Sequence, residues 1–282
     1  MQEKCLACSS FAIKEYKHLL VCKKCGFYVS KIKKSRGDIQ SYYDANFERQ
    51  QIVDKAKLNI YYKIIKFLIH RLGNKDIKVL EVGFGSGMLL KCLKQLGYEV
   101  YGVELSERAT QTLKNLIGKD NNIYLGSFEG VDLPEKFFDV VVLLDVLYEM
   151  EDMDFIFEKL NRILKDGGLL VIRVKNATVH IMLDRFSSIF NLFMNAPFVY
   201  HNFGFTFKSL KLILSKAGFK ILGNKAYLYL TLGDPYCQLR LSSSFVVWLK
   251  YIYFFVAEVF YYFTKIIITP SFLIFAYKSQ KG

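Results

Sequence analysis

Residues 79–87 contain the feature that most restricts how this chain can fold: an apolar run that ends in an acidic residue and three alternating glycines. The apolar run predicts a buried strand, and Gly83, Gly85 and Gly87 predict a tight loop after it. A side chain at any of these glycines would hold the loop backbone away from a ligand. A helix expected over 88–96 would turn its N-terminal amides towards the loop, which is an arrangement suited to a nucleoside cofactor.

A second strand is expected over 98–104, and its last residue, Glu104, follows the loop by about 20 residues, where a carboxylate can accept two hydrogen bonds from a ribose diol. The glycine spacing is Gly-x-Gly-x-Gly, whereas dinucleotide sites have Gly-x-Gly-x-x-Gly. Glu81, two residues before the first glycine, would repel a pyrophosphate and attract the ammonium of a methionine moiety. S-adenosylmethionine is therefore preferred to NAD as the cofactor. The expected ligands in this region are Glu81, Gly83, Gly85, Gly87, Glu104 and Leu105.

These residues resemble the class I S-adenosylmethionine-dependent methyltransferases, and the resemblance covers residues 77–230. Residues 138–147 look like the fourth strand of that family, and residues 162–172 look like its "rxLkpGGxlxi" turn and fifth strand. The resemblance implies an α/β fold with a doubly wound, seven-stranded, Rossmann-like sheet. Strands are expected near 77–82, 98–104, 122–126, 138–144, 168–174, 219–229 and 271–278.

The resemblance also implies further site residues at the ends of the third and fourth strands. Members of the family usually place a polar group near the adenine amine and an apolar neighbour against its ring, and Ser127 and Phe128 are the candidates here. Leu144 and Asp145 end the fourth strand over the glycine loop, at the edge where such sheets bind ligands. Asp145 is thus a candidate for cofactor binding and for catalysis, and Asp152 is the better candidate to cap the helix that follows.

The chain departs from the family after the fourth strand, where many members have an "xHvlEHv" segment and residues 145–150 contain no histidine. Residues 173–176 and 201–206 resemble the "vPN" and "HxxxFT" segments of a subgroup that acts in the synthesis of lipids, quinones and surface glycans. His201 lies near the expected acceptor pocket, and imidazole titrates in the range that suits a general base for a hydroxyl. A structural histidine is the alternative. No Asn-Pro-Pro-Tyr or Asp-Pro-Pro-Tyr follows the fourth strand, which disfavours methylation of adenine or glutamine nitrogen.

Four cysteines in two Cys-x-x-Cys pairs lie near the start of the chain: Cys5, Cys8, Cys22 and Cys25. Two such pairs predict a zinc ribbon in which four thiolates surround one zinc ion. The zinc would be structural, because four protein ligands leave no open coordination position. Two disulfides are the alternative, which a reducing cytoplasm disfavours. We expect a cytoplasmic protein, because the N-terminal residues are polar and lack the apolar segment of a signal peptide.

The formal net charge of +13 and the pI near 9.3 predict anionic surroundings, either nucleic acid or lipid headgroups. Basic residues gather in residues 11–36, where Glu15 is the one acid. They are Lys14, Lys17, Lys23, Lys24, Lys31, Lys33, Lys34 and Arg36. A solvated face around the ribbon and a docking patch for phosphate both remain open, with nucleic acid the less favoured partner.

The expected domains are a zinc ribbon at 1–36, a linker and leading helix at 37–72, and a methyltransferase domain at 73–282 with an apolar insertion at 231–269. The linker covers 37–49, and the leading helix covers 51–72. In related methyltransferases an aromatic pair before this helix folds over the cofactor, so Tyr42 or Tyr43 is a candidate to close the site. A linker tyrosine packed on the domain is the alternative.

Residues 245–263 are long enough to cross a membrane, but Lys250 and Glu258 lie within them, so no full crossing is expected. On a helix these two residues and Lys265 form one polar stripe, and the remaining surface is apolar and rich in aromatic residues. This pattern predicts a helix in the interface of an anionic membrane surface, at its inner face. Residues 181–199 add a second apolar face through Met182, Phe186, Ile189, Phe190, Phe193 and Met194. The alternatives are that the two helices pack together over the acceptor pocket or form a dimer interface.

The sequence as a whole predicts an S-adenosylmethionine-dependent methyltransferase for a hydrophobic, lipid-linked or glycan-biosynthesis acceptor, with O-methylation slightly preferred. Methyl transfer to RNA, held by the basic ribbon, is the first alternative. A non-catalytic, membrane-associated partner protein that binds S-adenosylmethionine is the second, which the intact glycine loop and its two carboxylates disfavour.

Overall fold

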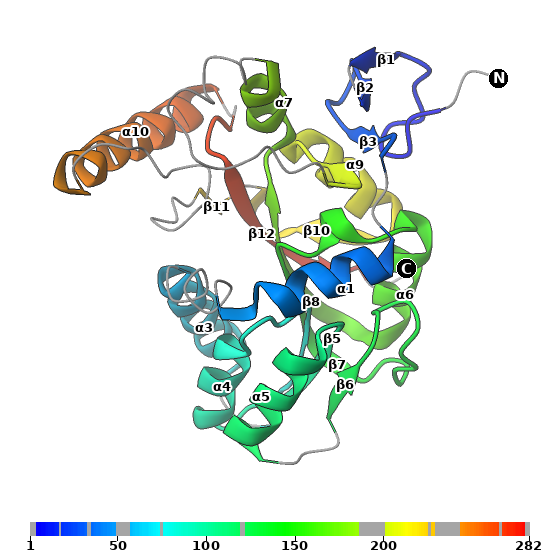
Figure 1. Ribbon diagram of the computed structural model, residues 1–282, viewed down its shortest axis with the longest axis vertical. Helices are drawn as coiled ribbons and strands as arrows, with labels where there is room; N and C mark the ends of the chain where they lie inside the picture. The colour runs from blue at the N-terminus through cyan, green and yellow to red at the C-terminus, as the bar shows by residue number, and fades with distance from the viewer. Residues whose placement is uncertain are drawn as a thin grey trace.

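The computed structural model describes residues 4–16, 18–32, 35–48, 57–73, 76–118, 122–185, 201–224, 227–228, 243–264 and 267–279 (Figure 1). Its central sheet has the strand order β6 (Ile123–Leu125), β5 (Glu99–Glu104), β4 (Lys78–Val82), β7 (Phe138–Leu144), β8 (Leu164–Lys175), β12 (Ser271–Lys278) and β10 (Phe219–Ile221). The strands from β6 to β8 are parallel, and β12 is antiparallel to both β8 and β10. This arrangement confirms the expected seven-stranded, doubly wound sheet.

The expected strands are confirmed with two differences in extent. The expected strand over 219–229 is broken, because η2 (Leu222–Asn224) separates β10 from the short β11 (Tyr227–Leu228), which pairs with β12. Gly223 in this turn has a φ of 63°, which leaves the extended conformation. Strand β8 begins at Leu164, earlier than expected, where it pairs with Phe138 ahead of a register shift.

Apolar side chains alternate across the sheet and enter two cores, as a sheet covered on both faces requires. Val140 and Val142 of β7 belong to one core, and Val141 and Leu143 belong to the other. The helices that pack into the first core are α3 (Leu58–Leu72), α4 (Met88–Gln95) and α5 (Glu107–Ile117), and those that pack into the second are α6 (Met153–Ile163) and α9 (Phe207–Lys216). Asp152 caps α6 as expected, because its carboxylate accepts a hydrogen bond from the Phe155 amide at 3.1 Å.

The first part of the segment 37–49, expected to be a linker, instead forms helix α1 (Arg36–Ala45). A capping box explains the helix: Ser35 accepts a hydrogen bond from the Asp38 amide, and Asp38 accepts one from the Ser35 amide, each at 3.1 Å. Helix α1 crosses in front of the central sheet in Figure 1. The expected leading helix over 51–72 is described from Leu58 onwards as α3.

The N-terminal strands β1 (Ile13–Tyr16), β2 (Leu19–Cys22) and β3 (Tyr28–Ser30) form an antiparallel sheet with β9 (Phe203–Gly204). Strand β9 follows the ribbon strands by more than 170 residues and belongs to the methyltransferase portion. The ribbon at 1–36 therefore shares its sheet with that portion. Cys5, Cys22 and Phe27 also belong to the second apolar core. The ribbon is therefore packed on the methyltransferase portion, in a place beside α9 (Figure 1).

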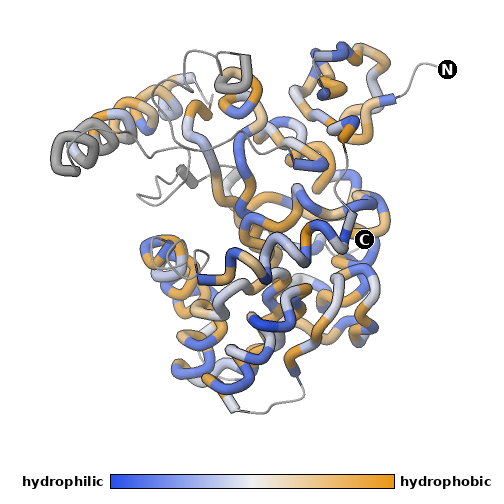
Figure 2. Tube along the Cα trace, viewed as in Figure 1, coloured by the Kyte–Doolittle hydropathy of each residue, from blue (hydrophilic) through white to orange (hydrophobic). Residues whose placement is uncertain are grey.

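Helix α7 (Ala177–Arg185) lies next to the ribbon, where Ala177 packs with Leu19 and Tyr28. Helix α10 (Ser243–Thr264) lies farther from the ribbon and extends away from the sheet (Figure 1). Apolar residues follow the sheet strands and also α10 (Figure 2). None of the described helices combines the length and the apolarity needed to cross a bilayer. Met182 is half exposed. The other residues of the expected second apolar face, Phe186, Ile189, Phe190, Phe193 and Met194, lie outside the described residues, as do 231–242.

Candidate active site

The loop after β4 adopts the conformation that its glycines predict. Gly83, Gly85 and Gly87 have φ values of 68°, 55° and 70°, in the left-handed region that favours glycine. A Cβ at Gly83 would lie 2.8 Å from the Cγ2 of Val146, and one at Gly87 would lie 2.5 Å from the Cδ1 of Leu113. Two of the glycines are thus needed for the loop to pack against its own neighbours, a reason that the sequence did not reveal.

Two buried carboxylates flank this loop. Glu81 on β4 is 3% exposed, and Glu104 at the end of β5 is 8% exposed. Glu104 accepts hydrogen bonds from the amides of Gly85 at 2.9 Å, Leu105 at 2.8 Å and Ser106 at 3.0 Å. Burial raises the pKa of Glu104, although these three amides oppose the rise. The two carboxylates fit S-adenosylmethionine, since in these positions they can accept hydrogen bonds from an ammonium and a ribose diol.

The candidate adenine contacts lie beyond β6. Ser127 is partly buried, and its hydroxyl accepts a hydrogen bond from the Gly130 amide at 3.1 Å. Phe128 is buried, and the Lys159 ammonium lies 5.1 Å from the centre of its ring. Leu144 is buried at the end of β7. The roles of these three residues towards the cofactor stay predictions.

Asp145 follows β7 with a φ of 63°, a left-handed conformation that is uncommon for a residue other than glycine. Its Oδ2 forms ion pairs with Arg173 and, at 3.1 Å, with Lys57, and its Oδ1 has no hydrogen-bond partner among the described residues. Burial opposes ionisation, but the charges of Arg173, Lys57 and Lys175 hold the pKa of Asp145 well below its usual range. Such a carboxylate is a weak base, so Asp145 is better suited to hold these cations in place than to accept a proton. Its catalytic and cofactor-binding roles stay predictions.

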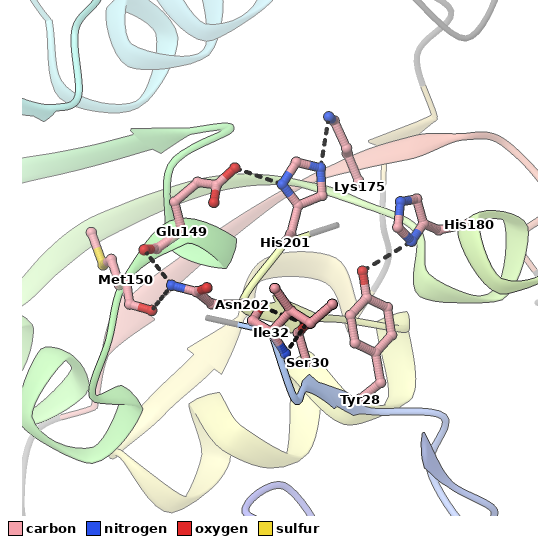
Figure 3. A network of polar contacts seen from close by, with 9 residues as sticks. All are labelled: Tyr28, Ser30, Ile32, Glu149, Met150, Lys175, His180, His201 and Asn202. Carbon is pink, nitrogen blue, oxygen red and sulfur yellow. Dashed lines mark hydrogen bonds and ion pairs between the residues drawn. The ribbon is translucent and has the colours of Figure 1, made fainter. Parts of the chain in front are cut away.

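His201 is buried between a carboxylate and an ammonium (Figure 3). Its Nδ1 lies 2.6 Å from Oε1 of Glu149, and its Nε2 lies 2.9 Å from Nζ of Lys175. An ammonium can only donate, so Nε2 accepts from Lys175 and Nδ1 carries the proton that is donated to Glu149. The ring of Tyr148 packs against the imidazole with centroids 4.2 Å apart. The imidazole is thus held at Nδ1 by a carboxylate and at Nε2 by an ammonium.

Sequence reasoning did not identify Glu149 and Lys175 as partners of His201. One signal was present: Arg173 and Lys175 are two residues apart, so they lie on the same face of β8 at its carboxyl end, where ligands bind. The segment after β7 contains no histidine of its own. His201, two residues before β9, contacts that segment through Glu149.

Helix α1 covers this edge of the sheet. Tyr43 is partly buried, and burial together with the nearby carboxylates of Glu149, Glu104 and Asp145 raises the pKa of its hydroxyl well above the ordinary value. Tyr42, by contrast, is 48% exposed. Of the two tyrosines that the sequence suggested, Tyr43 is therefore the one that faces the site.

The four ribbon cysteines converge as expected for a metal centre. Their sulfur atoms all lie within 4.8 Å of one another, with 3.6 Å between Cys5 and Cys25 and 3.5 Å between Cys8 and Cys22. None of the four is in a disulfide. Thiolates around one zinc ion stand about 3.8 Å apart, so the donor set fits zinc. Burial opposes ionisation of Cys22, but the amides of Cys25 and Lys24 lower its pKa to about 7.

The strand order, the glycine loop and its two carboxylates together define the fold of an S-adenosylmethionine-dependent methyltransferase. A family model described as "Methyltransferase domain" matches residues 57–223, which is more than half of the chain. The protein belongs to this methyltransferase family.

Curated relatives match the central part of the chain. Identity is 28% over 108 residues to a ubiquinone biosynthesis O-methyltransferase of Pelagibacter ubique, covering 37% of this chain and 45% of the relative. Identity is 29% over 96 residues to a demethylmenaquinone methyltransferase of Tropheryma whipplei, covering 34% of this chain and 40% of the relative. The chain thus spans less than half the length of these relatives.

Solved structures share the fold over most of the chain. The structure of magnesium protoporphyrin IX methyltransferase from Synechocystis PCC 6803 with bound SAH has a TM-score of 0.58 and 16% identity. The match covers 87% of this chain and all of that one. At this identity the likeness establishes the fold alone.

Proposed function

We propose that the protein methylates a hydroxyl group of a hydrophobic small-molecule or lipid-linked acceptor. The observation that carries the proposal is the contact of His201 with Glu149 and Lys175 at the carboxyl edge of the sheet. This edge also holds the glycine loop, and Val146, next to Asp145, lies against Gly83. Cofactor loop and candidate base therefore meet at the same edge of the fold.

S-adenosylmethionine, when bound, supplies a methyl group already activated by a sulfonium. Glu81, the glycine loop and Glu104 would hold it. His201 would take the proton of the acceptor hydroxyl at Nε2, and Glu149 would stabilise the resulting imidazolium through the Nδ1 proton. The Lys175 ammonium, displaced from Nε2, would lie beside the oxyanion that forms. A base is needed for a hydroxyl of high pKa, so this set of residues favours O-methylation.

The similarity to ubiquinone and menaquinone methyltransferases, as they are named, supports an apolar acceptor. The test uses radiolabelled S-adenosylmethionine and lipid extracts of cells that lack the active protein, followed by mass spectrometry of labelled products. Wild-type protein and the control His70→Gln, an exposed position on α3, should label one apolar product, and His201→Gln should not. Labelling that persists in folded His201→Gln protein would show that His201 is not the base.

The acceptor would reach the site from a membrane surface, which α10 contacts. Its described face opposite the buried Ala257 is exposed and apolar, and it includes Trp248, Phe255, Tyr262 and Phe263. These four side chains are 59%, 68%, 71% and 78% exposed. Aromatic rings of this kind favour the headgroup boundary, and the net charge of +13 favours an anionic leaflet. The side chains of Lys250 and Lys265, which the sequence places on the polar stripe, lie outside the described residues.

Vesicles of phosphatidylcholine with phosphatidylglycerol should sediment the protein at low salt, and vesicles of phosphatidylcholine alone should do so less well. Phe255→Glu with Phe263→Glu should abolish sedimentation, while Leu116→Glu, a half-exposed leucine on α5, should not. Trp248 is the single tryptophan of the chain, so a blue shift of its emission reports contact with lipid. Equal sedimentation of the wild type and the double variant would contradict membrane contact. A concentration-dependent dimer that Phe255→Glu disrupts would contradict it as well.

The RNA alternative receives less support from the ribbon. Lys31 pairs with Glu15 at 2.5 Å, and Arg36 pairs with Glu151 at 3.0 Å, so part of the basic patch is neutralised within the protein. Weak RNA binding that salt hardly changes would agree with this assignment. Tight binding with a steep salt dependence would favour the RNA alternative.

A further inference from the structure

The ribbon and the segment that carries His201 are parts of one sheet. Strand β3 pairs with β9, with Tyr28 opposite Gly204 and Val29 opposite Phe203. One residue further, the Ser30 amide donates a hydrogen bond to the carbonyl of Asn202 at 2.9 Å. The backbone that follows His201 is therefore hydrogen-bonded directly to the ribbon.

Asn202 joins the same backbone to the other side of the site (Figure 3). Its side-chain amide donates a hydrogen bond to the Glu149 carbonyl at 3.0 Å. Glu149 is the residue whose carboxylate holds His201. Residues 201–202 are thus held between Ser30 of the ribbon and Glu149, which ends the short helix η1 (Leu147–Glu149) after β7, and this fixes where the imidazole can lie.

Tyr28 of β3 makes a close contact with Gly204 of β9, between the ribbon and the segment that carries His201. It is 1% exposed, its hydroxyl lies 3.0 Å from Nδ1 of His180, and the His180 and His201 rings are 5.6 Å apart (Figure 3). A Cβ at Gly204 would lie only 1.8 Å from Cε1 of Tyr28. Strand β9 therefore needs glycine at this position to approach the ribbon.

The second cysteine pair packs on the residues that follow β9. The Thr206 hydroxyl donates a hydrogen bond to the Cys25 carbonyl at 2.6 Å, and a Cβ at Gly26 would lie 2.6 Å from Cγ2 of Thr206. The ring of Phe27 packs against those of Phe203 and Phe205, with centroids 5.9 Å and 5.5 Å apart. Loss of the metal would release the turn at Cys25 and remove its support from this segment.

We propose that the zinc ribbon is a positioning element of the active site, in which Tyr28 and β3 hold His201 in contact with Glu149 and Lys175. Tyr28 and Gly204 are positioning residues, because they act through His201. The ribbon is then an integral part of the catalytic fold and not a separable binding module. The chemical role of His201 rests on the proposed function, but its placement by the ribbon can be tested without an acceptor.

The test follows the imidazole nitrogens by NMR in the full-length protein. The chain has four histidines, and each signal is assigned by its loss in a His→Gln variant. In the zinc-loaded wild type, His201 should show a protonated Nδ1 and an unprotonated Nε2. After zinc is removed with 1,10-phenanthroline under reducing conditions, the His201 signal should move to that of an imidazole averaging between tautomers. His70, on the remote α3, is the internal reference and should not change.

Gly204→Ala should reproduce the change in His201 with zinc still bound, because the Tyr28 ring must move. Gly37→Ala is the matched control, since a Cβ there meets only the Ser35 Oγ, at 3.8 Å. If Gly204→Ala does not fold, hydrogen exchange of the wild type decides. Zinc removal should then speed exchange of the amides at 202–205 by at least about tenfold and leave those of β4 unchanged.

An unaltered His201 signal after zinc removal and in Gly204→Ala would overturn the proposal. Unaltered exchange at 202–205, or reduced protein that contains no zinc yet shows the wild-type His201 signal, would do so equally. Failure of the wild type to bind S-adenosylmethionine would instead contradict the proposed function, and the His201 signal would still decide the present proposal.

Discussion

A substitution at Glu104 should change the affinity for the cofactor and the stability of the protein by different amounts, and both can be measured. Glu104→Gln keeps the shape of the side chain but removes the charge that would accept hydrogen bonds from the ribose diol. Two charge-assisted hydrogen bonds are weakened, which corresponds to a loss of about 2 to 3 kcal/mol in binding free energy. The dissociation constant of S-adenosylmethionine should therefore rise by about 30- to 140-fold.

The stability of the cofactor-free protein should respond differently. Burial raises the pKa of Glu104 in the folded state. Ionisation of this group therefore lowers the stability of the folded state as the pH rises above the pKa of glutamate in the unfolded chain, which is about 4.3. Glutamine removes that penalty, but its amide nitrogen replaces an oxygen that accepts from a backbone amide such as that of Gly85. The two effects oppose each other, so the free energy of unfolding at pH 7 should change by less than about 1 kcal/mol.

Isothermal titration calorimetry at pH 7 measures the affinity, and urea unfolding measures the stability. The matched control is Glu107→Gln, an exposed carboxylate in the first turn of α5. It should leave both quantities unchanged. A dissociation constant for folded Glu104→Gln within twofold of the wild-type value would show that Glu104 does not hold the ribose.

Three other predictions concern the metal, the buried ion pairs and the glycine loop. Metal analysis should find one zinc ion per chain, and Cys22→Ser should release it while near-native far-UV circular dichroism persists; zinc-free wild type with reduced cysteines would refute the site. Asp145→Asn removes the carboxylate charge that faces Arg173 and Lys57, and it should lower the free energy of unfolding by about 3 to 5 kcal/mol. Because the folded-state pKa of Asp145 is lowered, the difference in free energy of unfolding between the wild type and this variant should be constant from about pH 5 to 8 and become smaller only as the pH falls below about 4. A difference that stays the same at low pH would contradict the assignment. Gly83→Ala should cost about 1 to 3 kcal/mol in urea unfolding, since it combines a left-handed φ with a clash against Val146, and wild-type stability would show that the loop can relax.

The sequence alone determined the architecture of the methyltransferase portion, because its signals are local. The apolar strands, the left-handed glycines and the capping residue Asp152 each act within a few residues, and the structure places them as expected. The sequence also placed Glu104 at the end of the strand after the glycine loop, and the structure pairs this strand with β4 and adds a hydrogen bond from the Gly85 amide to Glu104. The four cysteines were equally readable, since their spacing is itself the geometric requirement of a tetrahedral metal site.

Only the tertiary structure decided the arrangement around His201. Glu149 and Lys175 lie 52 and 26 residues from it in sequence, and neither spacing has a local signature. The same holds for β9, a two-residue strand too short to show any periodicity, which becomes a strand because the ribbon offers it a partner. Helix α1 is a similar case, because residues 36–45 lack a long apolar stripe and form a helix through the Ser35 cap and the position of the helix over the sheet. Contacts of this kind join residues that are far apart in sequence, so they depend on how several elements pack together. The pattern of residues within one element does not predict them.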